Sequence, residues 1–197
     1  MGFLGSARTF PHVQGGFRDR IVVEQSQCIK INANVSLAEA VCAEPLVVCL
    51  HAANQAGSLK GRRVQATGAG PIGSLGAAIA ALNQASDIVV TDLHDFTLSI
   101  ALKMGATQGI NVVTNKLALE DEISNADYFD FIFECSGAEA AIHTAIRVVR
   151  PRGTIIQVGV TGNLSIPINA LVGKEINFRG THRFHSEFQS AVDIDQY

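Results

Sequence analysis

Short apolar runs alternate with stretches of helical periodicity along most of this 197-residue chain. From residue 63 onward the apolar runs predict strands at 63–67, 88–91, 109–113, 129–134, 154–160, 164–168 and 176–180. The segments between them predict helices after residue 70, at 94–104, 116–126 and 138–150, and from residue 186. Strands that alternate with helices of about ten residues predict an α/β fold, a doubly wound parallel sheet with right-handed crossovers.

The first 60 residues are patterned differently. They predict a loop at 1–15, two short strands at 16–24 and 28–32, and helices at 36–41 and 44–56. Ser36 and Glu39 have the spacing of a capping box, in which each side chain bonds the backbone N–H of the other residue. Gly57 is expected to end the second helix, because glycine adopts the left-handed conformation found there.

A glycine-rich turn lies between the predicted strand at 63–67 and the helix that follows it. Gly68 permits a tight turn, Gly70 lets backbone N–H groups approach a pyrophosphate, and Gly73 lets the helix lie close to the strand. Pro71 fits the first helical turn, where its missing N–H would have had no intrahelical partner. The motif predicts a dinucleotide-binding Rossmann fold; the alternative is an ordinary glycine-rich turn in another α/β protein.

Asp92 ends the next predicted strand. A carboxylate at this point accepts hydrogen bonds from the 2′- and 3′-hydroxyls of a ribose and repels a 2′-phosphate. Leu93 and His94 follow it, with no Arg beside them to neutralise a phosphate. The sequence therefore predicts NAD, with NADP disfavoured. A second role for Asp92, as the N-cap of the helix that begins at His94, is compatible with the first.

Two further strand ends are expected beside the cofactor, because ligands of doubly wound sheets lie outside the carboxyl ends of the strands. The residues expected to line this crevice are Cys135, Ser136, Val158, Gly159 and Val160. For Cys135 the alternative is a buried side chain that acts as a small apolar group.

Gln65 is out of place in this pattern. It lies in the first parallel strand, where an apolar residue is expected on either face. A buried amide needs hydrogen-bond partners at both ends, and no feature of the sequence supplies them.

The composition is that of a globular domain, with 47% apolar and 17% charged residues. A net charge of −3 without an Arg-rich run argues against nucleic acid or an acidic membrane surface as a partner. We expect no signal peptide at the start of this sequence. We also expect no membrane span, because no apolar run approaches the roughly 20 residues that cross a bilayer. Cys28, Cys42, Cys49 and Cys135 form no C-x-x-C pair, which predicts free thiols in a reducing, cytoplasmic compartment.

Motifs along nearly the whole chain resemble those of the zinc-dependent medium-chain dehydrogenases, and within them the polyol branch. The matching motifs are GGF at 15–17, AEPL at 43–46 with His51-Ala52 after it, TGAGPIG at 67–73, VTD at 90–92, KMGA at 103–106, FDFIFECSG at 129–137, RPRG and QVGV within 150–160, and KEINFRGTHRFHSEF at 174–188. The resemblance implies hydride transfer from a polyol or sugar acid to NAD, with a zinc that polarises the alcohol oxygen.

The resemblance also implies that the chain is one part of a larger enzyme. In the family, the zinc is held by a β-rich, GroES-like catalytic domain, through a Cys and a His–Glu pair upstream of the GGF segment. Residues 1–40 are then the incomplete tail of that domain, and 41–197 are an NAD-binding Rossmann domain that is truncated at its C-terminal end. No zinc ligand is expected in this chain, which by itself should bind the dinucleotide and be inactive.

The resemblance assigns roles to individual residues. The pyrophosphate is expected to face Gly68, Gly70, Pro71, Ile72 and Gly73. Glu44 matches a glutamate near the zinc and its bound water, although a carboxylate that complements the helix dipole is an equal alternative. Arg183 matches an arginine that approaches the cofactor; the alternative is a surface arginine. His51 is expected to be a packed helix residue, and His182 and His185 to be surface histidines.

An edge strand is expected at 164–168, since Pro167 has no N–H to donate to a central ladder. An uncovered apolar edge invites pairing, and dimeric members of the family pair such an edge with its copy. The prediction is a homodimer or homotetramer through this edge.

Alternative functions stay open. One is another medium-chain dehydrogenase of the sorbitol or threonine type, and another is a non-catalytic dinucleotide-binding sensor module. The Glu44-Pro45 pair argues against the zinc-free quinone reductases, where no zinc-bound water needs that carboxylate.

Overall fold

The computed structural model describes residues 4–5, 10–115, 118 and 129–195. The chain divides into two units, Met1–Asn32 and Ala33–Tyr197. In the described part of the first unit, the helical element is the short 3-10 helix η1, Gln25–Gln27. The strands expected at 16–24 and 28–32 are wrong, because these residues form no ladder. Apolar side chains such as Phe17 and Val22 are exposed there, and a strand needs both a paired neighbour and a covered face.

Two helices open the larger unit. Helix α1, Leu37–Ala40, begins at Ser36, whose Oγ accepts a hydrogen bond of 3.2 Å from the N–H of Glu39, and the Glu39 carboxylate accepts one of 2.8 Å from the N–H of Ser36. The predicted capping box is therefore confirmed. Helix α2, Ala43–Ala56, ends at Gly57 with φ 96°, as expected of a glycine cap.

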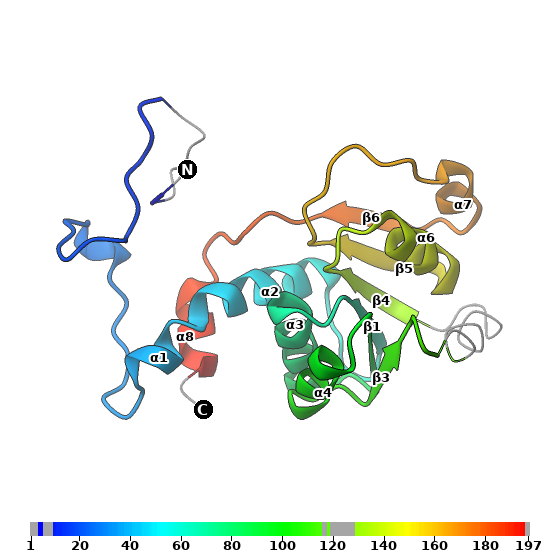
Figure 1. Ribbon diagram of the computed structural model, residues 1–197, viewed down its shortest axis with the longest axis horizontal. Helices are drawn as coiled ribbons and strands as arrows, with labels where there is room; N and C mark the ends of the chain where they lie inside the picture. Colours follow the sequence, from blue (N-terminus) through cyan, green and yellow to red (C-terminus); the bar gives the residue numbers. More distant parts are fainter. Residues whose placement is uncertain (1–3, 6–9, 116–117, 119–128, 196–197) are drawn as a thin grey trace. The chain divides into compact units, whose positions relative to one another are not determined.

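Six parallel strands form a single sheet (Figure 1). They are β1, Arg63–Thr67; β2, Asp87–Asp92; β3, Gln108–Asn111; β4, Phe129–Glu134; β5, Val149–Gln157; and β6, Asn177–Gly180. Their order across the sheet is β3-β2-β1-β4-β5-β6. The strand order reverses direction between β1 and β4, which makes this the switch point where ligands of such sheets bind. The predicted Rossmann fold is confirmed.

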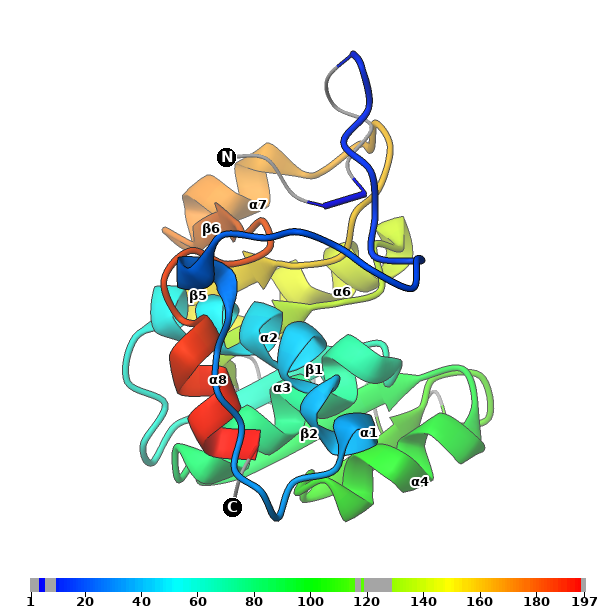
Figure 2. The same cartoon turned by 90° about the vertical axis from the view of Figure 1, so that its left-hand side faces the viewer.

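Helices cover both faces of the sheet (Figures 1 and 2). The remaining helices are α3, Pro71–Leu82; α4, Asp95–Lys103; α6, Glu139–Val148; α7, Ile168–Gly173; and α8, Phe188–Asp195. Val64 and Ala66 of β1 belong to the core shared with α2, α3, α4 and α8, whereas Ile132 and Ile155 belong to the core on the opposite face with α6. Alternate residues of β2, β4 and β5 thus fill two cores, which explains why these strands carry apolar residues on both faces.

Several element boundaries differ from the predicted ones, most of all where α6 meets β5. Helix α6 ends at Val148 and β5 begins directly at Val149, and the β4–β5 register shifts there. The edge strand expected at 164–168 is wrong for this chain. Pro167 is the N-cap of α7, while Leu164 and Ile166 pack against the core instead of extending the sheet. The helix expected at 116–126 lies outside the described residues, apart from Ala118.

One apolar segment, Leu37–Ala56, is long and apolar enough to cross a membrane, contrary to the sequence-based expectation. The segment is divided into α1 and α2, and α2 packs against α3 and α8. Its buried residues belong to the core, so its apolar composition is that of an interior helix.

Candidate dinucleotide-binding site

The turn between β1 and α3 depends on two glycines. Gly68 has φ 83°, and a Cβ there would lie 3.2 Å from the Cβ of Ser136. A Cβ at Gly73 would lie 1.7 Å from the carbonyl oxygen of Gly68. The tight turn at Gly68 and the close approach of the helix at Gly73 are therefore confirmed. The positive φ of Gly68 strains any residue with a Cβ, and a Cβ at Gly73 would collide with the backbone.

The first turn of α3 contains backbone N–H groups that have no acceptor within the helix. Gly70 is the N-cap and Pro71 is the first helical residue. The N–H groups of Ile72 and Gly73 follow it, too early in the helix to have a hydrogen-bond partner one turn before them. Among the described residues, a Cβ at Gly70 would meet no atom within 4 Å. Gly70 has φ −65°, so the fold does not require its flexibility. The open space above its backbone suits an anionic group at the positive end of the helix dipole.

The carboxylate of Asp92 anchors the turn and the start of α4 at once. Its Oδ2 accepts from the N–H of Ala69 at 2.6 Å, and its Oδ1 accepts from the N–H of His94 at 2.9 Å and the hydroxyl of Thr97 at 3.0 Å. Burial of the carboxyl opposes ionisation, but these donors hold the pKa of Asp92 below its usual value. These contacts therefore favour the charged form of Asp92, which is an acceptor at the carboxyl end of β2.

Glu134 is a site residue that the sequence analysis missed. Its fully buried carboxylate accepts hydrogen bonds from the Thr67 hydroxyl at 2.9 Å and the N–H of Ser136 at 3.0 Å. The Ser136 hydroxyl, the N–H of Gly137 and the amide of Gln157 also donate to it. One side chain thus joins the carboxyl ends of β1, β4 and β5. The available signal was an acid at the end of a mostly apolar strand, directly before Cys-Ser-Gly.

A cavity of about 560 Å³ opens at the carboxyl ends of β1, β2 and β4. Its lining residues are Gln65, Thr67, Gly68, Thr91, Asp92, Leu93, His94, Val112, Ser136, Ala138, Ala140, Ala141 and Thr144. The predicted residues Gly68, Asp92 and Ser136 therefore line the same cavity. The volume lies in the usual range of small-molecule sites, and the lining combines apolar walls with a few polar groups.

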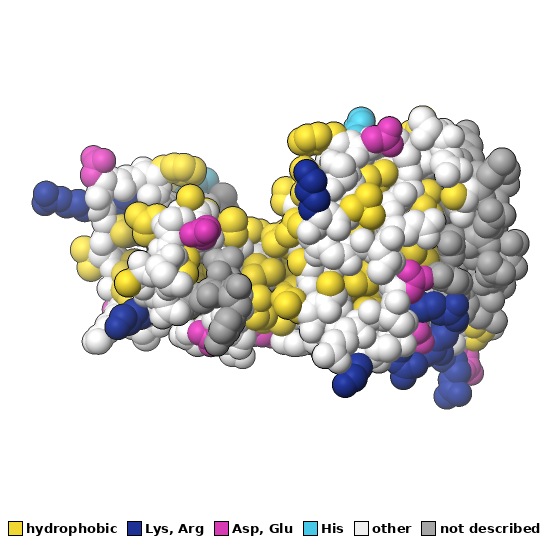
Figure 3. All heavy atoms as spheres, turned by 90° about the horizontal axis from the view of Figure 1, so that it is seen from below, with side chains coloured by type: hydrophobic (Ala, Val, Ile, Leu, Met, Phe, Trp, Pro, Cys, Tyr) yellow, Lys and Arg dark blue, Asp and Glu magenta, His cyan; other side chains and the backbone are white. Residues whose placement is uncertain are grey.

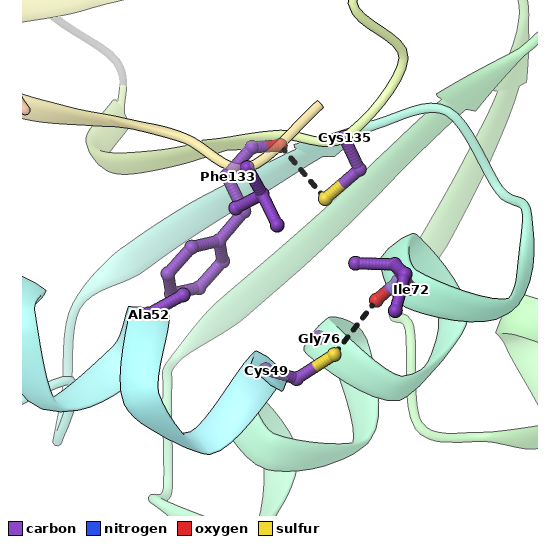
Figure 4. A pocket seen from close by; sticks show the side chains of 7 residues that line it. Cys49, Ala52, Ile72, Gly76, Phe133 and Cys135 are labelled. Atoms are coloured by element: carbon purple, nitrogen blue, oxygen red, sulfur yellow. Dashed lines mark hydrogen bonds between the residues drawn. The ribbon is translucent and has the colours of Figure 1, made fainter. Parts of the chain in front are cut away.

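Cys135 and Val158 lie elsewhere. With Cys49 they line a void of about 10 Å³ between α2, α3 and the sheet, and Figure 4 shows both cysteine sulfurs directed into it. The thiol of Cys49 donates to the carbonyl of Ile72 at 3.2 Å. Burial raises the pKa of Cys49 to about 12, and burial also raises that of Cys135. The Cys135 side chain thus packs against the core as a small apolar group, which is the alternative raised by the sequence.

The other predicted positions are distributed around these strand ends. Gly159 packs on the turn after β4, since a Cβ there would lie 2.5 Å from the nitrogen of Gly137, whereas Val160 is exposed. Arg183 is exposed in the segment that follows β6, with φ 56°. Glu44 is exposed in the first turn of α2, where its charge complements the helix dipole.

The described residues do not fit a zinc centre. Among them, no three His, Cys, Asp or Glu side chains are grouped to hold a metal ion. The buried sulfur atoms of Cys49 and Cys135 lie among apolar side chains, and a zinc site needs about four closely placed donors.

Comparison with known proteins gives consistent matches. The zinc-binding dehydrogenase family matches residues 71–195. The chain is 42% identical to L-idonate 5-dehydrogenase (NAD(P)(+)) of Escherichia coli K12, over 98% of this chain and 56% of that protein. It is 32% identical to sorbitol dehydrogenase 1 of Saccharomyces cerevisiae, over 93% of this chain and 54% of that protein. The crystal structure of the E. coli L-idonate 5-dehydrogenase superposes with a TM-score of 0.93, covering 97% of this chain and 55% of that one. The chain thus spans about half the length of the curated relatives it matches.

Proposed function

The chain belongs to the zinc-binding dehydrogenase family, and on this premise we propose that it is the NAD-binding part of an enzyme that oxidises a polyol or sugar acid. The proposed reaction is oxidation of L-idonate at C5 to 5-keto-D-gluconate. The 42% identity to an L-idonate 5-dehydrogenase supports this substrate class over that of the sorbitol dehydrogenase, which is 32% identical. By itself this chain is proposed to bind the dinucleotide without turnover.

The observation that carries the proposal is the placement of Asp92 beside the glycine turn. The Asp92 carboxylate holds the N–H of Ala69 and lines the same cavity as Gly68. A dinucleotide needs an anion site next to an acceptor for ribose hydroxyls, and these residues supply both. The bound nicotinamide supplies the hydride acceptor. The residues of this chain bind the pyrophosphate at the start of α3 and orient the adenosine ribose.

Preference for NAD follows from the charge of Asp92. A 2′-phosphate beside this carboxylate would meet a second negative charge, and the adjacent Leu93 and His94 offer no guanidinium to offset it. The test is a titration of the chain with NADH and NADPH, followed through the fluorescence of the reduced nicotinamide because the chain has no Trp. Saturable NADH binding with much weaker NADPH binding supports the proposal. Equal affinity for NADH and NADPH would contradict the role assigned to Asp92. If the chain binds neither NADH nor NADPH, the proposed function of the isolated chain is wrong.

A homodimer or homotetramer through the segment around residues 164–168 is also proposed. Large apolar side chains near this segment are exposed, namely Val160, Ile168 and Val172. Uncovered apolar side chains of this kind are typical of association sites. Figure 3, seen from below, shows a different side of the molecule, where apolar side chains are interspersed with charged ones. A single monomeric species in sedimentation at micromolar concentration would overturn this assignment.

A further inference from the structure

A network of side chains ties α2 to the segment that follows β6. His51 of α2 is buried, and its Nδ1 lies 2.8 Å from Oε1 of Glu187, just before α8. The other carboxylate oxygen of Glu187 accepts a hydrogen bond of 2.9 Å from the N–H of His185. The rings of His51 and His185 meet edge to face, with centroids 4.9 Å apart. One end of the segment is thus fixed to α2 by hydrogen bonding and ring packing together.

The other end of the segment is fixed by Gln55, one turn after His51 on α2. Its Nε2 donates to the hydroxyl of Thr181 at 3.0 Å and lies 3.1 Å from Nε2 of His51. The carbonyl oxygen of Gln55 accepts from the Arg179 guanidinium at 3.0 Å. His51 and Gln55 therefore form one continuous network, which holds Thr181 directly after β6 as well as Glu187.

Arg183 lies between these two anchor points in a conformation that needs support. Its φ of 56° is left-handed, a backbone conformation that is strained for a residue with a Cβ. Such strained positions persist where neighbouring contacts fix the backbone, and they are concentrated at functional sites. Here the fixed neighbours are Thr181 on one side and His185 with Glu187 on the other.

We propose that His51 is a positioning residue that holds the 181–187 segment so that Arg183 faces the bound dinucleotide. This inference rests on the proposed function, because it takes Arg183 as a cofactor contact. The geometry gives His51 this role because it is hydrogen-bonded at both ring nitrogens, toward Glu187 at one end of the segment and toward Gln55 and Thr181 at the other. Partial burial would raise the pKa of Glu187, but the donors around it lower this pKa to about 2, which favours its charged form.

A double-mutant cycle on NADH affinity tests this role. His51→Leu and Arg183→Ala are measured alone and together in the whole chain, alongside the wild-type protein. We expect each single variant to weaken NADH binding about fivefold or more, and the double variant to bind no more weakly than Arg183→Ala alone. The inference is overturned if the two single variants weaken NADH binding independently, so that their effects multiply in the double variant. It is also overturned if either single variant binds NADH as tightly as the wild-type chain. If the wild-type chain binds no NADH, the proposed function fails as well, and the two failures are distinguishable.

Limited trypsin digestion supplies a readout that does not need the cofactor. Cleavage after the exposed Arg183 should be several-fold faster in His51→Leu than in the wild-type chain, because the loosened backbone fits the protease better. Glu187→Gln, which keeps a hydrogen-bonding oxygen but removes the charge, should give a smaller increase. Cleavage after Arg18, in the other unit, and after Arg63, in β1, should be unchanged. Faster cleavage at Arg63 as well would show general unfolding, and unchanged cleavage at Arg183 would overturn the inference.

Discussion

The Oδ2 atom of Asp92 accepts a hydrogen bond of 2.6 Å from the backbone N–H of Ala69, in the middle of the glycine turn. This contact connects the carboxyl end of β2 to the loop between β1 and α3. The other carboxylate oxygen accepts from the N–H of His94 and the hydroxyl of Thr97. The residue predicted to bind the ribose is therefore also a structural anchor of the site. Its substitution should change both the cofactor affinity and the stability.

Asp92→Ala should weaken NADH binding about tenfold or more and narrow the preference for NADH over NADPH, because the ribose acceptor and its charge are lost. It should also lower the free energy of unfolding by about 1–3 kcal/mol, since three donors lose a charged acceptor. The measurements are fluorescence titration and urea unfolding. Asp193→Ala on α8 is the control, because it removes the same charge at an exposed position away from the cavity. NADH affinity equal to that of the wild-type chain would exclude the ribose role.

Gly73→Ala should prevent the native turn from forming. The new Cβ would lie 1.7 Å from the carbonyl oxygen of Gly68, and only movement of the backbone relieves that clash. Gly76→Ala, one turn further along α3, is the matched control, because a Cβ there would meet no described atom within 4 Å. It should stabilise the chain by about 0.5–1 kcal/mol, since alanine is the better helix former. Circular dichroism with urea unfolding compares the two; equal stability would contradict the steric argument.

The turn and the sheet could be predicted because their constraints are local. The conformation of Gly68 and the contact at Gly73 follow from sterics that only glycine satisfies, and strand-helix alternation sets the topology. The strands expected at 16–24 and 164–168 failed because a strand also needs a paired neighbour, which the pattern of one segment does not reveal. The orientation of Cys135 is a matter of alternation, since it directly follows Glu134, whose side chain points to the opposite face.

The function of Glu134 could not be derived from its position in the sequence. Its five neighbouring donors come from β1, the turn after β4 and β5, and are brought together only by the fold. Arg183 shows the same limit, because its left-handed backbone and the fixed residues on both sides of it depend on contacts with α2. Sequence motifs identified the strand ends that carry the site, whereas the side chains that hold those ends in place emerged from packing.

Gln65→Leu should stabilise the chain. Gln65 is fully buried, and neither atom of its amide has a hydrogen-bond partner among the described residues. Replacing an unpaired buried amide by an apolar group of similar size removes a desolvation cost of about 1–3 kcal/mol. Gln157→Leu is the matched control, because its amide nitrogen donates to Glu134 and to the carbonyl of Gly159, so its loss should destabilise the chain. Thermal unfolding of both variants decides the point, and a lower melting temperature for Gln65→Leu would show that the amide is satisfied in solution.

Two of the four cysteines should react with a thiol reagent in the native state. Cys28 and Cys42 are exposed, whereas the sulfur atoms of Cys49 and Cys135 are directed into the small void in the core (Figure 4). Burial raises the pKa of Cys49 to about 12 and raises that of Cys135, and only the thiolate is reactive. Ellman's reagent should therefore titrate two thiols rapidly and all four in urea. A variant with both Cys28→Ser and Cys42→Ser is the control, and it should lose the rapid phase of the reaction. If mass spectrometry shows that Cys135 of the native wild-type chain is labelled during the rapid phase, the Cys135 sulfur atom is not buried.

Glu187 should make the stability of the chain depend on pH in the acidic range. Partial burial would raise the pKa of its carboxyl, but hydrogen bonds from His51 and from the N–H of His185 lower it from 4.5 to about 2. A folded-state pKa below the unfolded value stabilises the folded chain above about pH 4.5, and this contribution is lost as the pH falls to about 2. The wild-type melting temperature should therefore exceed that of Glu187→Gln at pH 6, with the difference shrinking below pH 4.5 and vanishing near pH 2.

Glu139→Gln, at an exposed position on α6, should follow the wild-type profile, because its ion pair with His143 spans 3.9 Å at the surface. A Glu187→Gln profile parallel to that of the wild-type chain down to pH 2 would show that the carboxylate does not hold the segment after β6.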